Sequence, residues 1–426
     1  MEVRPGYKHS EVGVIPEDWE TEPCSGISER IMVGIVIRPT QYYVPAGVPA
    51  LRSANIRVDG ITDSDLVFIS TKSNALLAKS QTRAGDVLTV RTGYPGTSAV
   101  VHSSHAGCNC IDILITRPTA AVDSEFLAFW INSPMGKGQV LRNQGGLAQK
   151  HFNVGDMRNL VVALPKLYEQ ELIAKALKDV DVLVGSLEGM IVKKRDLKQA
   201  TMQQLLTGHT RLPGFSGEWE SKELSQLGEI SGAGIDKKIR PGEPPVRLVN
   251  YMDVYRRNFI YSRDLDQVVT ARPEQASRCA VKKGDVFFTP SSEMPFDVAA
   301  SAVALEDIPD ASYSYHVVRL RLDARWDLTF RGYVFKSQKF LDQAARACEG
   351  SGVRYVITQT RFRKLSVRFP QNKAEQSAIA TVLSDMDAEI EALEQRLNKI
   401  RDLKQAMMQE LLTGRIRLVS PEARHG

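Results

Sequence analysis

The sequence predicts a mixed α/β protein in which two domains are joined by two long helices that form an antiparallel coiled coil. Three observations predict this fold: one long helical segment occurs twice, its apolar residues have heptad spacing, and the regions beside it are rich in strand-forming residues. We place the first domain at residues 1–164 and its helix at 165–212. The second domain then covers 213–369, and the second helix with a C-terminal tail covers 370–426.

The repeated segment consists of Glu169–Leu212 and Glu375–Leu418, which align without a gap at an offset of 206 residues. Half or more of the aligned positions are identical, and Arg195–Ala200 recurs unchanged as Arg401–Ala406. Each copy follows a proline and ends in Leu-Leu-Thr-Gly, where glycine commonly terminates a helix. Each copy therefore predicts a helix of about 40 residues, or roughly 60 Å. The repeat indicates duplication of a domain together with its helix.

Apolar side chains in the second copy recur at alternating intervals of four and three residues, from Ile379 to Ile400. This spacing is the a/d seam of a coiled coil. The next apolar residues, from Leu403 onward, are out of phase with the seam, so we expect the packing to change there. The first copy has the same seam, but Gly185 and Gly189 weaken its helix by about 1 kcal/mol each relative to alanine.

Charge indicates the direction in which the helices pair. The early half of each helix is acidic, as at Asp181 and Asp387, and the later half is basic, as at Lys198 and Lys404. Antiparallel pairing places each acidic half against a basic half, whereas parallel pairing places like charges together. We therefore expect an intramolecular antiparallel coiled coil. The alternative is that each helix docks separately on its own domain.

The two domains contain short runs that alternate apolar and polar residues, which is typical of strands, with a few short helical segments between them. The clearest predicted strands are Asp86–Arg91, Ile111–Thr116 and Val317–Leu322, and the predicted short helices are Ser124–Asn132 and Phe330–Ala347. The domains are faint copies of each other: Gly85–Val87 recurs as Gly284–Val286, and the segment around Trp19 resembles that around Trp219. Similar helices with divergent domains indicate one module used for two related but unlike tasks.

Composition limits the classes of function. A net charge of +5 permits nucleic-acid binding without requiring it. The N-terminus is polar, no apolar run is long enough to cross a bilayer, and five scattered cysteines predict a reducing compartment, so we expect a cytoplasmic protein. The sequence has no phosphate-binding loop, no Asn/Asp-Pro-Pro-Tyr/Phe motif and no metal-ligand spacing among its histidines. These absences predict a chain that is not an enzyme and that binds no metal.

This layout resembles the specificity subunits of type I restriction–modification systems over essentially the whole chain. The resemblance rests on the doubled helix ending in Leu-Leu-Thr-Gly, on the opening segment Tyr7–Trp19, and on the loop Arg91-Thr92-Gly93-x-x-Gly96. The second domain departs from this pattern, because Thr289–Ser292 replaces the loop and its arginine. Contacts made by the second domain therefore cannot be inferred from the first.

The resemblance implies that each domain is a target-recognition domain, which binds one half of a bipartite, asymmetric DNA site. It implies that the helices set the spacing between the halves and dock two methyltransferase subunits, which motor–nuclease subunits then join. S-adenosylmethionine, ATP and Mg would belong to those partner subunits, with no cofactor bound by this chain. Two alternatives remain open: a structural scaffold joining two protein-binding domains, and the specificity module of another phage-defence methylation system.

Residues that contact DNA should be cations for the phosphates and polar or aromatic side chains for the bases. The candidates in the first domain are Arg52, Asn55, Arg91, Thr92, Tyr94, Lys150 and His151. The candidates in the second domain are Asn250, Tyr251, Arg256, Arg257, Ser291, Ser292, Arg354, Tyr355, Gln359, Thr360 and Arg361. Arg91 and the stretch 354–361 are the leading candidates. For each residue the alternative is an ordinary surface or structural role.

Overall fold

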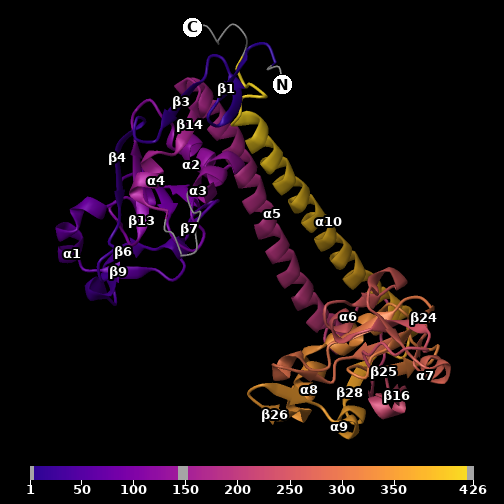
Figure 1. Cartoon of the computed structure of the whole chain (residues 1–426). Helices are drawn as coiled ribbons and strands as arrows, with labels where there is room; N and C mark the ends of the chain where they lie inside the picture. Colours follow the sequence, from indigo (N-terminus) through magenta and orange to yellow (C-terminus); the bar gives the residue numbers. More distant parts are fainter. Residues whose placement is uncertain (1–3, 143–151, 420–426) are drawn as a thin grey trace. The chain divides into compact units, whose positions relative to one another are not determined.

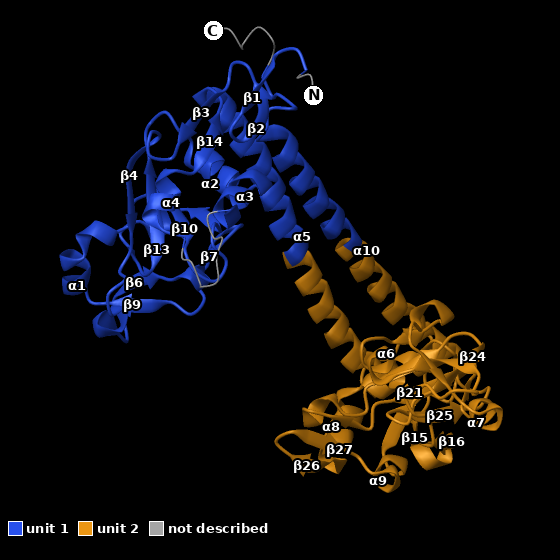
Figure 2. Ribbon diagram, viewed as in Figure 1, with its two compact units in different colours: residues 1–188, 395–426 blue, residues 189–394 orange. Residues whose placement is uncertain are grey.

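The computed structural model describes residues 4–142 and 152–419 (Figure 1). The chain divides into two compact units. Unit 1 is formed by residues 1–188 and 395–426, and unit 2 by residues 189–394 (Figure 2). Each unit therefore contains one strand-rich domain and a part of each long helix.

The two long helices are present where the repeat predicts them. Helix α5 spans Leu167–Thr207 and crosses from unit 1 into unit 2, and helix α10 spans Lys373–Leu411 and crosses from unit 2 into unit 1. No helix in the described ranges is long and apolar enough to span a membrane.

Unit 1 is built on two four-stranded sheets with short helices beside them. The first sheet has the order β11 (Ser98–Val100), β10 (Val87–Val90), β13 (Ile113–Pro118) and β4 (Ser28–Val33). The second has the order β12 (Asn109–Cys110), β6 (Val48–Leu51), β9 (Val67–Ile69) and β5 (Tyr43–Val44). Two-stranded sheets pair β1 (Tyr7–Ser10) with β2 (Gly13–Pro16), β3 (Glu20–Pro23) with β14 (Val161–Leu164), and β7 (Ile56–Arg57) with β8 (Gly60–Ile61). The helices are α1 (Thr71–Leu76), α2 (Ser124–Asn132), α3 (Pro134–Arg142) and α4 (Val154–Arg158).

Unit 2 repeats this plan, with five strands in its larger sheet. Its larger sheet has the order β16 (Gly228–Ser231), β25 (Val318–Leu322), β21 (Asp285–Phe288), β23 (Ser301–Ala304) and β18 (Phe259–Ile260). The second sheet has the order β19 (Val268–Thr270), β17 (Pro245–Val249), β24 (Ile308–Tyr313) and β20 (Ala280–Val281). Smaller sheets join β22 (Ser291–Ser292), β27 (Arg354–Val356) and β26 (Glu349–Ser351), and β15 (Glu220–Glu223) with β28 (Ser366–Phe369). The helices are α6 (Tyr251–Tyr255), α7 (Pro273–Arg278), α8 (Gln338–Ala347) and α9 (Gln359–Arg363).

The long helices pair in opposite directions within each unit, through ion pairs that are repeated at the 206-residue offset with the partners exchanged. The pairs are Asp181–Lys404 and Glu188–Arg401 in unit 1, and Asp387–Lys198 and Glu394–Arg195 in unit 2. Each pair joins the acidic half of one helix to the basic half of the other. The structure thus confirms the predicted antiparallel coiled coil.

The apolar seam lies between the helices as the heptads predict. Among its members, Leu187, Ile191, Ile390 and Leu397 are buried. Leu403 falls where the seam loses its phase, and it is half exposed, as is Leu197, its counterpart in the first helix. The change of packing expected at this position is therefore confirmed, and it leaves one leucine of each helix partly open to solvent.

The exposed ion pairs should contribute little to stability. We expect Glu188→Gln and Glu394→Gln each to lower the free energy of unfolding by less than about 1 kcal/mol, because partly exposed pairs gain little over hydration. Urea unfolding followed by circular dichroism measures this, with Glu171→Gln, an exposed change on α5, as the control. Losses above about 2 kcal/mol would contradict the exposed character of these pairs.

A buried tryptophan–glutamate–arginine cluster joins the domain of unit 1 to both helices. The Trp19 indole Nε1 donates to Glu169 Oε2 (3.2 Å) near the start of α5. Arg417, which follows α10, donates from Nη2 to the same Oε2 (2.7 Å) and from Nη1 to Asp18 Oδ1 (2.9 Å). Burial alone would lower the pKa of the Arg417 guanidinium, but its bonds to Asp18 and Glu169 raise it overall. This cluster connects segments about 400 residues apart in the chain.

Unit 2 contains the equivalent cluster. Its glutamate comes from the start of the second repeat and its arginine from the end of the first. Trp219 Nε1 donates to Glu375 Oε1 (3.3 Å), and Arg211, which follows α5, donates from Nη2 to Glu375 Oε2 (2.6 Å). Glu375 and Arg417 are the repeat partners of Glu169 and Arg211. The domains diverged while their attachment to the helices was kept.

Glycine is required where each long helix ends. Gly208 and Gly414 have φ of +71° and +67°, a left-handed conformation that terminates helices. A Cβ on Gly208 would lie 3.0 Å from the Trp219 ring, and one on Gly414 would lie 2.4 Å from Pro16. The predicted helix stops are therefore also the sites where each domain approaches the helix backbone.

Two predicted elements are wrong in their bounds. The segment Phe330–Ala347 begins with two 3-10 turns and becomes helical only at Gln338. Its first residues are buried almost without interruption, so they offer no polar face for a surface α-helix. The strand predicted from Ile111 starts at Ile113, because Asp112 has a left-handed backbone (φ +52°).

Candidate nucleic-acid interface

The structure gathers five of the candidates in unit 2 around one depression of about 660 Å³. They are Asn250, Tyr251, Ser291, Ser292 and Arg354. These residues come from α6, β22 and β27, which are far apart in sequence. Convergence of distant polar and aromatic residues on one concave surface is what a recognition site requires.

Helix α6 presents two aromatic rings to this depression. Tyr251 and Tyr255 lie four residues apart and stack with their centroids 5.8 Å apart at 19°. Asn250 caps the helix: its Oδ1 accepts from Tyr251 N (2.8 Å) and its Nδ2 donates to Gln267 Oε1 (2.7 Å). Asn250 therefore positions the tyrosines, while its own amide is already hydrogen-bonded.

Arg354 is an exposed cation of the depression, as is Lys237. Arg354 Nη2 donates to Ser291 Oγ (3.1 Å), and the guanidinium makes no ion pair among the described residues. An anchored guanidinium with free donors can bind a phosphate or the acceptor edge of a guanine. Arg354 is the strongest of the sequence candidates on geometric grounds.

Several residues that line the same depression were not predicted from the sequence, among them Lys237, Tyr255 and His316. Burial, then the positive charges of Lys237 and Arg354, lower the pKa of His316. The adjacent lysines at 237 and 238 could have been identified as a basic cluster. His316 could not, since its neighbours in the depression are distant in sequence.

The remaining candidates of unit 2 do not line this depression. Arg256 and Arg257 follow α6, and Arg257 is paired with Asp253 (3.1 Å). Tyr355 is partly buried against the main core of the unit. Gln359 and Thr360 lie exposed on α9, with Arg361, whose Nη2 pairs with Glu349 (2.6 Å).

In unit 1 the leading candidate is held by an internal ion pair. Arg91 Nη1 lies 2.5 Å from Asp112 Oδ1, its Nε donates to Phe152 O (3.3 Å), and its side chain is only 16% exposed. Thr92 Oγ1 donates to Asp112 Oδ2 (3.3 Å). A base contact by Arg91 would have to form beside or in place of the Asp112 pair. Tyr94, at the tip of the same loop, is 84% exposed.

Two further candidates of unit 1 shape a turn. Asn55 is fully buried, and its Oδ1 accepts from Arg52 N (2.9 Å) while its Nδ2 donates to Thr62 O (3.1 Å) and Ser64 O (2.8 Å). Its amide is therefore consumed inside the protein and is not presented to a ligand. Arg52 donates from its guanidinium to the carbonyl of Asp65. Lys150 and His151 lie outside the described residues.

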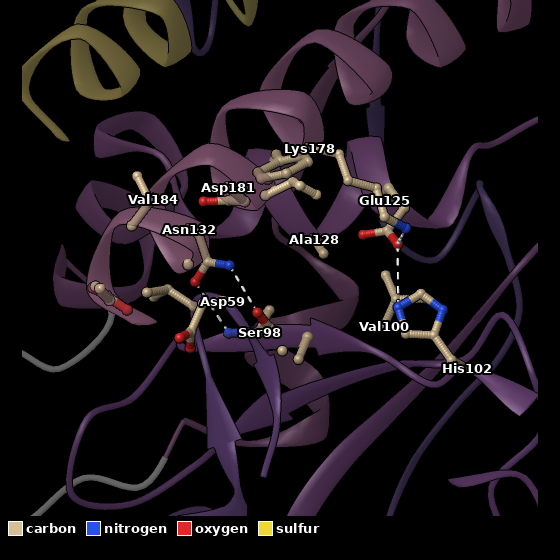
Figure 3. Close-up of a pocket in the computed structure, with 17 residues that line it drawn as sticks. Asp59, Ser98, Val100, His102, Glu125, Ala128, Asn132, Lys178, Asp181 and Val184 are labelled. Carbon is tan, nitrogen blue, oxygen red and sulfur yellow. Dashed lines mark hydrogen bonds and ion pairs between the residues drawn. The ribbon is translucent and has the colours of Figure 1, made fainter. Parts of the chain in front are cut away.

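A separate pocket of about 270 Å³ in unit 1 lies between α2 and α5. Glu125 lies between Lys178 (2.6 Å) and His102 (3.5 Å), as Figure 3 shows. Asp59 and Asp181 also line it, and burial raises the pKa of Asp181. Its four lining carboxylates, those of Asp59, Glu125, Asp181 and Glu188, outnumber its one lysine, Lys178, so this pocket is unsuited to a phosphate of DNA.

The described residues offer little for covalent or metal chemistry. Burial raises the pKa of Cys24 to about 12 and also raises that of Cys348, so neither thiol is a ready nucleophile. No cluster of three or more His, Cys, Asp or Glu side chains that could hold a metal occurs in the part of the chain the structure covers.

Comparison with known proteins agrees with the repeated architecture. Residues 58–191 and 216–402 match the family model of the type I restriction modification DNA specificity domain. The putative type I restriction enzyme MjaX specificity subunit of Methanocaldococcus jannaschii is 22% identical over 422 residues, covering 97% of each chain.

Two solved structures share the fold. The S subunit of a type I restriction–modification system from M. genitalium matches with a TM-score of 0.54 at 11% identity, over 96% of this chain and 98% of that one. A chain solved in a study of assembly and conformational transition in a type I system matches with a TM-score of 0.57 at 14% identity, over 94% and 99%. The family model matches once in each repeat and covers most of the sequence, so the chain belongs to the type I restriction modification DNA specificity domain family.

Proposed function

We propose that this chain is the DNA sequence-specificity subunit of a type I restriction–modification complex. Each unit binds one half of a bipartite, asymmetric site, and the paired helices set the spacing between the halves. The observation that carries the proposal is a contrast between the two units. Their domains attach to the long helices through the same contacts, but the loops that they expose differ. The clusters at Glu169 and Glu375 are equivalent, whereas the loop at Arg91 and its replacement at Ser291 present different chemistry.

The helices are also the proposed docking sites of two methyltransferase subunits. Apolar side chains remain exposed on them away from the seam, including Val182, Val192, Leu197 and Leu403. Exposed apolar residues on a paired helix support a protein interface. Because Leu197 and Leu403 are repeat partners, they support one docking position on each helix. Motor–nuclease subunits would join this core.

The chain itself is proposed to be non-catalytic and to act in the cytoplasm. S-adenosylmethionine, ATP and Mg are expected on the partner subunits, which would methylate adenine and cleave DNA. In this proposal, the chain supplies only sequence recognition and assembly.

The test is duplex binding by the chain in complex with its methyltransferase subunits. We expect affinity to fall steeply as salt rises, because phosphate contacts release counterions. Scrambling either half of the site should weaken binding by about 10³-fold or more at fixed salt. Binding that ignores sequence, or no binding at all, would support the scaffold alternative and contradict the proposal.

A further inference from the structure

A two-stranded hairpin lies at the margin of unit 2, beside the depression around Arg354 (β26 and β27 in Figure 2). Gly352 and Val353 connect its strands as a two-residue turn. Strand β27 also pairs with β22, which ties the base of the hairpin to the unit, and the tip at residues 351–354 extends beyond this pairing. Neither strand of the hairpin contains a buried residue. The tip is therefore a ribbon that is open to solvent.

Two glycines fix the shape of this hairpin. Gly350 and Gly352 have φ of +123° and +67°, which strain any residue that carries a Cβ. A Cβ on Gly350 would also clash with the carbonyl oxygen of Arg354 across the hairpin. The hairpin is thus specified by its own sequence, and its tip presents Val353 and Arg354 in a defined conformation.

Val353 is an unexpected residue at this tip. It occupies the second position of the turn, and 83% of it is exposed. Two-residue turns that begin with glycine favour Asn, Asp or Ser at the second position, where a polar side chain faces water. Because neither turn chemistry nor core packing accounts for Val353, its methyl groups are available for contact with another molecule.

Val353 belongs to a group of exposed apolar side chains in the same depression. Four large apolar or aromatic lining residues are between 39% and 83% exposed: Met252, Tyr255, Met294 and Val353. Single exposed apolar side chains are ordinary on a protein surface, but several that converge on one concave site indicate a binding surface. The valine therefore forms part of a surface that is suited to an apolar group of a ligand.

The polar groups of the depression are mixed rather than uniformly basic. Lys237 and Arg354 supply cations, whereas Glu293 and Asp297 supply carboxylates. Phosphates require cations, but base edges in the major groove present acceptors, amino donors and the thymine methyl group side by side. Guanidinium, carboxylate and valine methyl groups complement these three in turn. The depression thus suits the edges of bases better than the DNA backbone.

We propose that the tip of the β26–β27 hairpin enters the major groove and that Val353 contacts the methyl group of a thymine in the half-site of unit 2. The major groove is wide enough to admit a two-stranded ribbon. This inference rests on the proposed function and deepens it, because it names a base that unit 2 recognises. Val353 is then a specificity-determining residue that reads shape and apolar surface, while the adjacent Arg354 supplies hydrogen bonds.

The test measures binding of the complex with methyltransferase subunits to duplexes in which deoxyuridine replaces single thymines. Deoxyuridine lacks only the C5 methyl group and keeps the hydrogen-bonding groups of thymine, so the replacement isolates an apolar contact. The half-site of unit 2 is the one that changes when residues 213–369 are exchanged for those of a relative. At one thymine of that half-site, the replacement should weaken wild-type binding about fourfold, the effect of burying one methyl-sized group.

The same duplexes are then measured with Val353→Ala. This variant should bind the thymine duplex about fourfold more weakly than the wild type does, because its side chain no longer reaches the methyl group. It should bind the uridine and thymine duplexes equally, since the two changes remove the same contact.

Val268→Ala is the matched control. Val268 lies on β19, is 51% exposed and does not line the depression. This variant should bind as the wild type does and should show the same fourfold loss on the uridine duplex. Both valines are exposed, so thermal melting followed by circular dichroism should give the wild-type Tm for both variants.

The outcomes separate this inference from the proposed function. A uridine effect that persists in Val353→Ala, or no effect at any thymine of the half-site, overturns the contact, while preference for the cognate duplex leaves the specificity function standing. Weaker assembly of Val353→Ala with the methyltransferase subunits, at an unchanged uridine effect, assigns the valine to a protein interface and also overturns it. Equal binding of cognate and scrambled duplexes by the wild type contradicts the proposed function, and the inference with it.

Discussion

Replacing Arg417 with alanine is expected to lower the free energy of unfolding of unit 1 by about 3–5 kcal/mol. The Glu169 carboxylate is only 3% exposed, and Arg417 lies 2.7 Å from it. Without the guanidinium, this carboxylate stays buried with the Trp19 indole as its remaining partner, and a neutral donor cannot replace a cation. The loss should therefore exceed that of any exposed ion pair in the coiled coil.

Urea unfolding followed by tryptophan fluorescence measures this effect, since Trp19 belongs to the cluster. Arg415→Ala is the matched control: it removes an exposed arginine two residues away, paired with Glu410 at 3.5 Å, and should cost less than about 0.5 kcal/mol. Arg211→Ala should reproduce the large loss in unit 2 through Glu375. Equal effects of Arg417→Ala and Arg415→Ala would show that the cluster does not hold the domain to the helices.

Arg354→Ala is expected to weaken DNA binding by about 1–3 kcal/mol, and through only one half of the site. Arg354 is exposed, is hydrogen-bonded to Ser291, and lines the same depression as the stacked rings of Tyr251 and Tyr255. If its guanidinium reads a base, the loss should disappear on duplexes that are already scrambled in the half-site of unit 2. If it binds a phosphate, the loss should be the same for all duplexes.

Competition binding at fixed salt distinguishes these outcomes. The duplexes carry the intact site, a scrambled first half or a scrambled second half, and the protein is the complex with methyltransferase subunits. Arg278→Ala, an exposed arginine outside the depression, is the control and should bind as the wild type does. Wild-type affinity of Arg354→Ala for the intact site would remove Arg354 from the recognition surface.

Local periodicity explains why the helices could be predicted so fully. The seam from Ile379 to Ile400 and the exchanged charges at Asp181 and Lys404 are properties of sequence spacing, and the structure pairs them accordingly. Trp219 could be matched to Trp19 by eye, but their shared contact with a helix glutamate could not be predicted. That contact joins residues about 150 positions apart.

The recognition surface was harder to predict because its members converge from distant strands. The pattern around Arg91 indicates a polar loop. The Asp112 carboxylate that pairs with Arg91, however, lies just before β13, in a different part of the sequence. Asn55 looks like a surface amide in the sequence and is a buried turn residue in the structure. His316 was missed for the same reason, since only the fold brings it near Arg354 and Lys237.

Adenine methylation across the source genome would show whether the two related units recognise two unlike half-sites. Single-molecule sequencing should reveal one bipartite, asymmetric motif that disappears when the gene for this chain is deleted. Exchanging residues 213–369 for the corresponding domain of a relative should then change one half of that motif and preserve the other. Persistence of the motif after deletion, or a change in both halves after the exchange, would contradict the account.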